Sequence, residues 1–340
     1  MRGARSRKLG DDGAEPGPGV PSDSEIAARG VADDDNVAVG GDELPGSIAG
    51  GDAGGGDNND ESGEAKFHYF TYATHRGSDD LFCKALSSAW HARVPLQILG
   101  WGTRWTGLAD KLKGVQLALE ALPPHDIFVF VDAYDVLFVE NVDVLQEAYV
   151  AAMAQYAREA DLGDVVLFAG ERGCWPYMDG RPEGKELCEV VYPTSPTPYR
   201  YVNSGMWAGT VRSAQRLMAL VADVLAAAPD GANDQEIISD LYLARIPGVT
   251  DSPIVLDTAT WLFMCLHLSQ TDLHNDLTNK LTGHKPAILH FNGGSKPSMR
   301  SIASALPTPR SEAPEFDLAS IAADGGLELT RASLADLCRP

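Results

Sequence analysis

The 340-residue sequence contains no hydrophobic run of the length that spans a membrane. A transmembrane helix needs about 20 consecutive, mostly apolar residues. The most apolar helical stretch, residues 214–228, contains Arg216 and Asp223 and is typical of an amphipathic helix. The basic first residues are not followed by an apolar core, so we also predict no signal peptide. We therefore expect no transmembrane segment, and composition alone assigns no compartment.

Cysteine is scarce, with five residues at positions 83, 174, 188, 265 and 338. None forms a Cys-x-x-Cys pair, and the spacing fits no zinc site. An odd, scattered set favours free thiols. A bridge between Cys174 and Cys188 is the alternative if the protein folds in an oxidising compartment. The oxidation state of the cysteines is therefore left open.

Aromatic residues are absent from the first 66 positions, which hold 15 of the 34 glycines and 15 acidic against 6 basic residues. Such a segment cannot bury enough apolar surface to offset the entropy that folding removes. We predict that residues 1–66 form a disordered acidic segment. The net charge of the chain is −21, which argues against nucleic acid as a partner because phosphate backbones attract basic proteins.

From residue 67 onward, strand-like and helix-like stretches alternate. Phe67–Tyr72 and residues 94–99 have the composition of strands, and residues 79–91 between them have helical spacing. This order predicts parallel strands joined by a crossover helix. We expect an α/β domain over residues 67–300. For residues 301–340, rich in Ser, Pro and Ala, we predict a mostly disordered tail with one weak helix at 332–338.

Two aspartates follow the most apolar run of the chain. Residues 127–131 (IFVFV) indicate a strand buried on both faces, and the run ends in Asp132 and Asp135. Like charges are costly at a dry strand end, and a divalent cation such as Mn²⁺ or Mg²⁺ removes that cost. Ligands of open α/β sheets bind at the carboxyl ends of strands. The alternative is a pair of solvated turn aspartates.

Another strand end carries His290, followed by Asn292 and Gly293. The imidazole could be a third metal ligand, and glycine would let the backbone approach a phosphate closely. Lys296 could neutralise a diphosphate as a point charge. Taken singly, His290 is more typical of a buried core histidine, and Lys296 is equally typical of a solvated loop lysine.

Three further positions have both a functional and a structural interpretation. Asn203 lies in what we predict to be a small polar turn, suited to binding sugar hydroxyls or simply to turning the chain. Asp234 lies at a helix start, where an acidic residue is more often a cap than a catalytic group. Trp175 is either a platform for a sugar ring or a loop anchor. No role is assigned to the histidines without ligand spacing, His267, His274 and His284.

Taken in order, these motifs resemble the glycosyltransferase domain of the procollagen lysyl hydroxylase/glycosyltransferases, a domain of GT-A type. The matching stretches are 99–105 (LGWGTRW), 130–136 (FVDAYDV), 168–176 (FAGERGCWP), 201–205 (YVNSG), 233–235 (NDQ) and 290–293 (HFNG), with Lys296 beyond. They occur in the family's order at similar separations. The resemblance implies a GT-A-like, Rossmann-type mixed sheet flanked by helices.

The resemblance also implies a role for each matching residue. A Mn²⁺ ion bridging the diphosphate of a UDP-sugar would be held by Asp132, Asp135 and His290. The nucleotide would be bound by Thr71, Thr74, Lys111 and Tyr134, the two threonines bordering the uracil. The phosphates would be contacted by Asn292, Gly293 and Lys296. The sugar and acceptor side would be lined by Trp175, Asn203 and Asp234.

The function implied is transfer of glucose or galactose from a UDP-sugar to a hydroxyl of a protein or glycan acceptor. The family's own acceptor is collagen hydroxylysine, and its compartment is the secretory pathway. Asp234 would be the general base if the reaction inverts configuration. The family's acidic run is reduced here to residues 232–234, so a nucleotide-sugar-binding protein without transferase activity is one alternative. An interaction module with an acidic arm is another.

Overall fold

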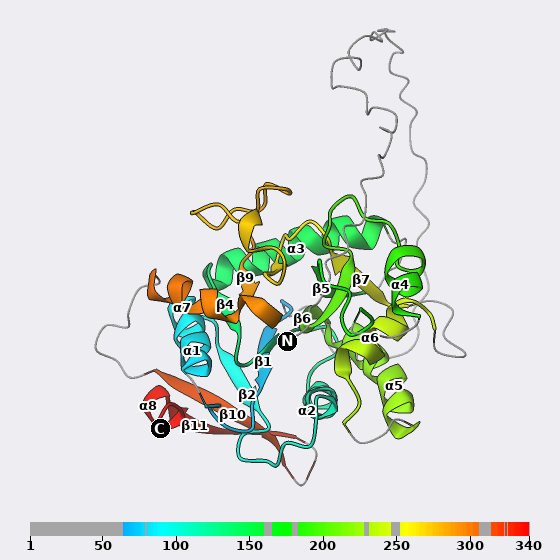
Figure 1. Cartoon of the computed structure of the whole chain (residues 1–340). Helices are drawn as coiled ribbons and strands as arrows, with labels where there is room; N and C mark the ends of the chain where they lie inside the picture. Colours follow the sequence, from blue (N-terminus) through cyan, green and yellow to red (C-terminus); the bar gives the residue numbers. More distant parts are fainter. Residues whose placement is uncertain are drawn as a thin grey trace, which may run out of the picture. The chain divides into compact units, whose positions relative to one another are not determined.

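The computed structural model describes residues 64–339, apart from 79, 160–164, 179–182, 228–230, 246–251, 306–313, 323 and 325 (Figure 1). The acidic segment predicted to be disordered therefore lies outside the described residues, except for residues 64–66. None of the helices in the described ranges is long and apolar enough to cross a membrane.

The fold is built on an eight-stranded mixed sheet. Its strands are β1 (Phe67–Tyr72), β2 (Leu96–Leu99), β3 (Ile127–Asp132), β5 (Val166–Glu171), β6 (Tyr201–Thr210), β7 (Ile254–Asp257), β10 (Glu315–Ile321) and β11 (Leu327–Ser333). Their order across the sheet is β11-β10-β2-β1-β3-β6-β5-β7. Strands β10, β2, β1 and β3 are parallel, whereas β6 is antiparallel to both β3 and β5. The predicted Rossmann-type mixed sheet is confirmed.

Helices cover both faces of this sheet (Figure 1). One face packs against α1 (Leu81–His91) and α3 (Val142–Glu159), and the other against α2 (Ala109–Glu120), α5 (Val211–Ala227) and α6 (Asp234–Tyr242). Successive residues of β1 point to opposite faces, so Tyr69 lies in one core and Phe70 in the other. Because both faces are covered, the residues of β3 before Asp132 are all buried.

A second sheet of three strands, β4 (Val136–Phe138), β9 (Ile288–His290) and β8 (Phe263–Cys265), lies beyond the end of β3. β4 begins directly after Asp135 and pairs antiparallel with β9, with Val136 opposite His290. This register brings the end of β9 to the β3–β4 connection. A short 3₁₀ turn, Gly293–Ser295, then leads from β9 into α7 (Lys296–Ala305).

The prediction of a mostly disordered tail at residues 301–340 is wrong for residues 301–305, which belong to α7, and for the strands β10 and β11, whereas the weak helix predicted at 332–338 is present at residues 334–337. β10 joins the sheet beside β2, β11 forms its edge, and α8 (Leu334–Leu337) follows. The sequences EFDLASI and LELTRAS of the two strands alternate apolar and polar residues only weakly, because an edge hairpin buries little. Its partner β2 is also more than 200 residues away in the chain, so no local pattern predicts the pairing.

Four of the five cysteines form disulfides, so the prediction of free thiols is wrong for them. Cys174 pairs with Cys188, which was the alternative, and Cys83 of α1 pairs with Cys338 just after α8. The second pairing joins residues 255 positions apart, a partnership that spacing alone could not indicate. Cys265 is a buried free thiol. The first bridge ties residue 174 to the π-helical turn Leu187–Val191 that follows the short helix α4 (Gly184–Glu186).

Residues 203–205 are part of a strand, whereas the sequence predicted a turn. They lie near the start of the ten-residue strand β6, opposite a register irregularity between Phe168 and Ala169 of β5. The sequence predicted a turn because Asn203 and Ser204 are polar, and polar side chains are uncommon in a buried strand. They are tolerated there because side chains of neighbouring elements satisfy their hydrogen bonds.

Candidate active site

The two aspartates and the histidine predicted as metal ligands meet at one point. Asp132 is the last residue of β3, Asp135 immediately precedes β4, and His290 is the last residue of β9. Their ligand atoms all lie within 4.8 Å of one another. Nε2 of His290 is 3.3 Å from Oδ1 of Asp135 and 3.6 Å from Oδ2 of Asp132. Three strand ends therefore deliver two carboxylates and one imidazole to the same place.

The neighbouring residue Asn203 fixes which nitrogen of His290 faces the carboxylates. The backbone N–H of Gly205 donates to Oδ1 of Asn203 at 3.0 Å, which identifies this atom as the oxygen. His290 Nδ1 lies 3.0 Å from the same oxygen, so Nδ1 carries a proton and donates it. Nε2 is buried, makes no hydrogen bond and is aimed at the two carboxylates.

An unprotonated Nε2 facing two carboxylates is electrostatically unfavourable unless a cation lies between them. A proton is one such cation: burial lowers the pKa of His290, but Asp135 and Asp132 outweigh that effect and raise the pKa. For the carboxyl group of Asp135 burial acts in the other direction and raises the pKa, but His290 and Lys296 lower it to about 2. A divalent metal ion is the other. The donor set, two carboxylate oxygens and one imidazole nitrogen oriented by an amide, therefore fits a metal site.

Gly205 of β6 is required by this geometry. A Cβ at this position would lie 2.7 Å from Oδ2 of Asp132 and closer still to Cε1 of His290. The β6 backbone thus forms one wall of the cluster, and only glycine leaves room for both ligands.

Two lysines compensate the negative charge. Nζ of Lys111, from α2, lies 2.8 Å from Oδ1 of Asp132 and 2.7 Å from Oδ2 of Asp234, at the start of α6. Burial lowers the pKa of Lys111, but the two aspartates outweigh it and raise the pKa well above its ordinary value. Lys296, at the start of α7, lies 3.0 Å from Oδ2 of Asp135. Neither pairing with Lys111 was predicted.

The sequence did not single out Glu171, although this residue is the centre of the polar network beside the cluster. It ends β5 and is buried, and its carboxylate accepts hydrogen bonds from Asn203 at 3.1 Å, Gln235 at 2.7 Å and Asn292 at 2.7 Å. Burial raises its pKa against the effect of these donors. The signal that could have found it is the one used for Asp132, a carboxylate at the end of an apolar strand.

Two cavities meet at the cluster and share Leu108, Lys111, Asp132, Asp135 and Lys296. The first, which we call the Tyr134 cavity, has a volume of about 300 Å³ and is otherwise lined by Tyr72, Ala73, Thr74, His75, Trp105, Ala133 and Tyr134. The second, the Glu171 cavity, has about 310 Å³ and is otherwise lined by Glu171, Trp175, Asn203, Ser204, Gly205, Asp234, Gln235, His267, His290, Asn292 and Gly293.

The predicted site residues divide between these cavities, with one exception. Thr71 is buried within β1 and lines neither. Asn292 does line the Glu171 cavity, but its Nδ2 donates to Glu171 and its Oδ1 accepts from the backbone N–H of His267. Trp105 and His267 were assigned no role, and the structure places each of them in a cavity.

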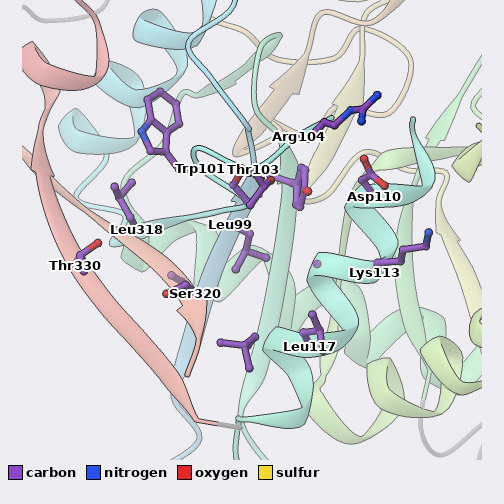
Figure 2. A pocket seen from close by; sticks show the side chains of 15 residues that line it. Leu99, Trp101, Thr103, Arg104, Asp110, Lys113, Leu117, Leu318, Ser320 and Thr330 are labelled. Atoms are coloured by element: carbon purple, nitrogen blue, oxygen red, sulfur yellow. Dashed lines mark hydrogen bonds between the residues drawn. The ribbon is translucent and has the colours of Figure 1, made fainter. Parts of the chain in front are cut away.

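A third and larger cavity, of about 490 Å³, shares the lining residue Tyr72 with the Tyr134 cavity. It is bounded by α2 and by the hairpin β10–β11, with Lys113 and Leu117 on one side and Leu318 and Thr330 on the other (Figure 2). It contains none of the predicted site residues and a single carboxylate, Asp110. We therefore choose the candidate site by the convergence of charged strand ends and not by the size of the cavity.

Known proteins resemble this chain at the level of family and fold. The sequence profile of the family described as PLOD GT domain matches residues 63–313. An uncharacterised protein, R699 of Acanthamoeba polyphaga mimivirus, is 26% identical over 210 residues, which is 58% of this chain and 40% of that protein. The chain thus corresponds to less than half the length of this relative.

Solved structures with a similar arrangement include the galactosyltransferase LgtC in complex with donor and acceptor sugar analogues. Its sequence is 11% identical to this chain, the alignment covers 71% of this chain and 97% of that chain, and the TM-score is 0.41. Mouse xyloside xylosyltransferase 1 has 14% identity, with 68% and 99% covered and a TM-score of 0.41. At this level of similarity, neither structure bears on the chemistry of this chain.

Proposed function

The chain belongs to the PLOD GT domain family, the glycosyltransferase domains of the procollagen lysyl hydroxylases, and from that membership we propose that it is a metal-dependent transferase that moves glucose or galactose from a UDP-sugar to an acceptor hydroxyl. The observation that carries this proposal is the cluster of Asp132, Asp135 and His290, with a buried, unpartnered imidazole nitrogen facing two carboxylates where two cavities meet.

Asp132, Asp135 and His290 would hold the metal ion, for which we propose Mn²⁺ because carboxylate oxygens dominate the donor set. When bound, such an ion supplies Lewis-acid stabilisation of the charge on a departing nucleoside diphosphate. Asn203 orients His290 by accepting a hydrogen bond from its Nδ1–H group, and Gly205 leaves room for the ligands. Lys111 and Lys296 line both cavities where the two meet, and their positive charges there would offset the negative charge of the diphosphate.

The Tyr134 cavity is the proposed site of the nucleoside. Tyr72, Trp105 and Tyr134 give it aromatic walls, and Tyr72 and Trp105 lie with their ring centroids 6.1 Å apart. Aromatic faces bind a nucleobase by stacking. Tyr134 is held by the hydrogen bond from its hydroxyl to the carbonyl oxygen of His75 at 2.6 Å, which fixes the direction of its ring.

The Glu171 cavity is the proposed site of the sugar and of the acceptor hydroxyl. Its amide and carboxylate side chains suit the hydroxyl groups of a hexose, and Trp175, which is 39% exposed, offers an apolar ring face. If the reaction inverts configuration, Asp234 is the candidate general base. Its Oδ2 is engaged by Lys111 and Ser204, so Oδ1 would take the proton. If configuration is retained, the departing diphosphate can accept that proton.

The acceptor we propose is a hydroxyl of a protein or glycan, with hydroxylysine of a collagen-like protein as the first to test. The two disulfides support an oxidising compartment, since such bonds persist outside the reducing cytosol. A nucleotide-sugar-binding protein without transfer remains the second candidate, because the acidic residue that would act as base, Asp234, is held by a lysine.

The experiment that tests the proposal measures release of UDP from UDP-glucose and from UDP-galactose by the full chain, with and without Mn²⁺ and with a hydroxylysine peptide. We expect Mn²⁺-dependent release that is lost in D132A and in D135A. Asp223, an exposed carboxylate of α5 remote from both cavities, provides the matched control D223A, which should keep wild-type activity. Full activity in both D132A and D135A would refute the assignment, and tight binding without release would favour the second candidate.

A further inference from the structure

His267 lies in the Glu171 cavity, two residues beyond β8, and no pattern in the sequence gave it a function. Its ring is half-buried and lies against the glycine turn that follows β9. The contacts of this residue determine both where the ring lies and which nitrogen carries its proton.

The proton of the neutral imidazole is on Nε2. The backbone N–H of Gly294 donates to Nδ1 of His267 at 3.2 Å. A ring nitrogen that accepts a hydrogen bond has no proton of its own, so the other nitrogen must be the donor. The tautomer is therefore the reverse of that of His290, whose Nδ1 donates to Asn203.

The position of the ring is fixed from two directions. The backbone N–H of His267 donates to Oδ1 of Asn292 at 3.0 Å, and Asn292 is itself held by Glu171. Gly293 has φ +52° and passes so close that a Cβ there would lie 2.8 Å from His267 Nδ1. A glycine is required at residue 293 both for this backbone conformation and for the ring beside it.

The donor so formed has no acceptor in the part of the chain that the structure describes. His267 Nε2 makes no hydrogen bond to any of the described residues, and unlike His290 Nε2 it is not sealed from solvent. The edge of the ring that carries Cδ2 and Nε2 faces Gly173, on the far side of the ring from the glycine turn. A fixed N–H group without a partner thus borders the cavity.

We propose that Nε2–H of His267 donates a hydrogen bond to a hydroxyl of the transferred hexose and so helps to select the sugar. The inference rests on the proposed function of the site. A hydroxyl is favoured over a phosphate because the two lysines of the site lie at the boundary with the Tyr134 cavity, whereas the neighbours of His267 are Asn292 and the glycines at 173, 293 and 294, which bring no positive charge. A polar group placed to bind one hydroxyl discriminates against sugars that lack it in that position.

Two substitutions separate donation to the sugar from support of the glycine turn. The amide nitrogen of Gln reaches about as far as Nε2 of His, whereas the amide oxygen of Asn lies where Nδ1 does. H267Q therefore keeps the donor into the cavity, and H267N keeps the acceptor for Gly294 N–H. His274, an exposed histidine that lines neither cavity, provides the control H274N.

The measurement is the affinity of the full chain, in Mn²⁺, for UDP, UDP-glucose and UDP-galactose by isothermal titration calorimetry. A neutral hydrogen bond is worth roughly 0.5–1.5 kcal/mol, so its loss weakens binding by about two- to twelvefold. We expect H267N to bind at least one UDP-hexose more weakly by that factor, while its affinity for UDP is unchanged. We expect H267Q and H274N to keep affinities close to those of the wild type.

The inference is overturned if the ratio of UDP-hexose to UDP affinity is unchanged in H267N, or if H267Q loses as much as H267N. Thermal unfolding of each variant verifies that the protein titrated is folded. A wild-type chain that binds no UDP refutes the proposed function itself, whereas UDP binding with an unchanged ratio in H267N refutes only the role of His267.

Discussion

Replacement of Gly205 by alanine should weaken metal binding without touching a ligand. The added Cβ would lie 2.7 Å from Oδ2 of Asp132 and closer still to Cε1 of His290. Non-bonded carbon atoms are at their optimum at roughly 3.5–4.0 Å, so the ligands or the β6 backbone must move by about 1 Å. His290 is buried and Asp132 is half-buried, and both lie directly against the β6 backbone, so they have little freedom to move away from an added Cβ.

The size of the effect follows from two known costs. Overpacking of a well-packed interior costs about 1–3 kcal/mol of the free energy of unfolding. Disturbing the groups that orient a metal ligand typically lowers metal affinity by about 10–100-fold. We therefore expect G205A to fold with a lower unfolding midpoint and to bind Mn²⁺ about 10–100-fold more weakly than the wild type.

Mn²⁺ titration by calorimetry, together with thermal unfolding, measures both quantities. Gly209, on the same strand, provides the control G209A, whose Cβ would lie 2.9 Å from Ser213 Oγ and far from the ligands. It should lose stability but keep its Mn²⁺ affinity. Wild-type Mn²⁺ affinity in a folded G205A would contradict the geometry described for the cluster.

Three further outcomes are expected. The carboxylate neighbours of His290 raise its pKa although burial lowers it, so the protonated ring stabilises the metal-free protein fully below about pH 6.5, and this stabilisation is lost as the pH rises through the raised pKa. Over that pH range the thermal unfolding midpoint of the metal-free protein should fall, and it should fall less in H290N. The Mn²⁺ affinity should rise over the same range, because the metal replaces a proton on the ring. K111M removes the cation that pairs with Asp132 and Asp234, and it should lower the free energy of unfolding, measured by urea titration, by about 3 kcal/mol. An unchanged free energy of unfolding would show that the two ion pairs contribute no net stability. Removal of the Cys83–Cys338 bridge by C83A/C338A should cost about 2–5 kcal/mol of stability and leave UDP binding intact, because neither cysteine lines the two cavities at the cluster. A loss of UDP binding by the folded variant would contradict this prediction.

The candidate metal cluster could be predicted because Asp132 and His290 each end an apolar run and Asp135 lies three residues beyond Asp132. Asp132 follows five buried residues of β3, and His290 ends β9 in the same way. Strand ends of an α/β sheet converge, so residues 158 positions apart could be expected to meet. Glu171 satisfies the same criterion, but it follows Ala169 and Gly170, small residues that make the preceding apolar run less distinct.

The contacts that could not be predicted depend on side-chain direction or on distant pairing. Nothing local in the sequence indicates that Lys111 of α2 reaches Asp234 of α6, because that contact depends on how the two helices sit on the sheet. His267 acquires its place from the turn at Gly293, which belongs to a different segment of the chain. The edge hairpin of β10 and β11 was missed for a similar reason, since β10 is specified by its distant partner β2 more than by its own composition.

The most direct test of the account is a titration of UDP into the full chain with Mn²⁺ and with a chelator in its place, for the wild type and for H290A. If Asp132, Asp135 and His290 form the metal site that anchors a nucleoside diphosphate, UDP binds in Mn²⁺, binds far more weakly with the chelator, and loses its Mn²⁺ dependence in H290A. Equal UDP affinity in all of these conditions, or no UDP binding in any of them, would contradict the assignment of the cluster and the function built on it.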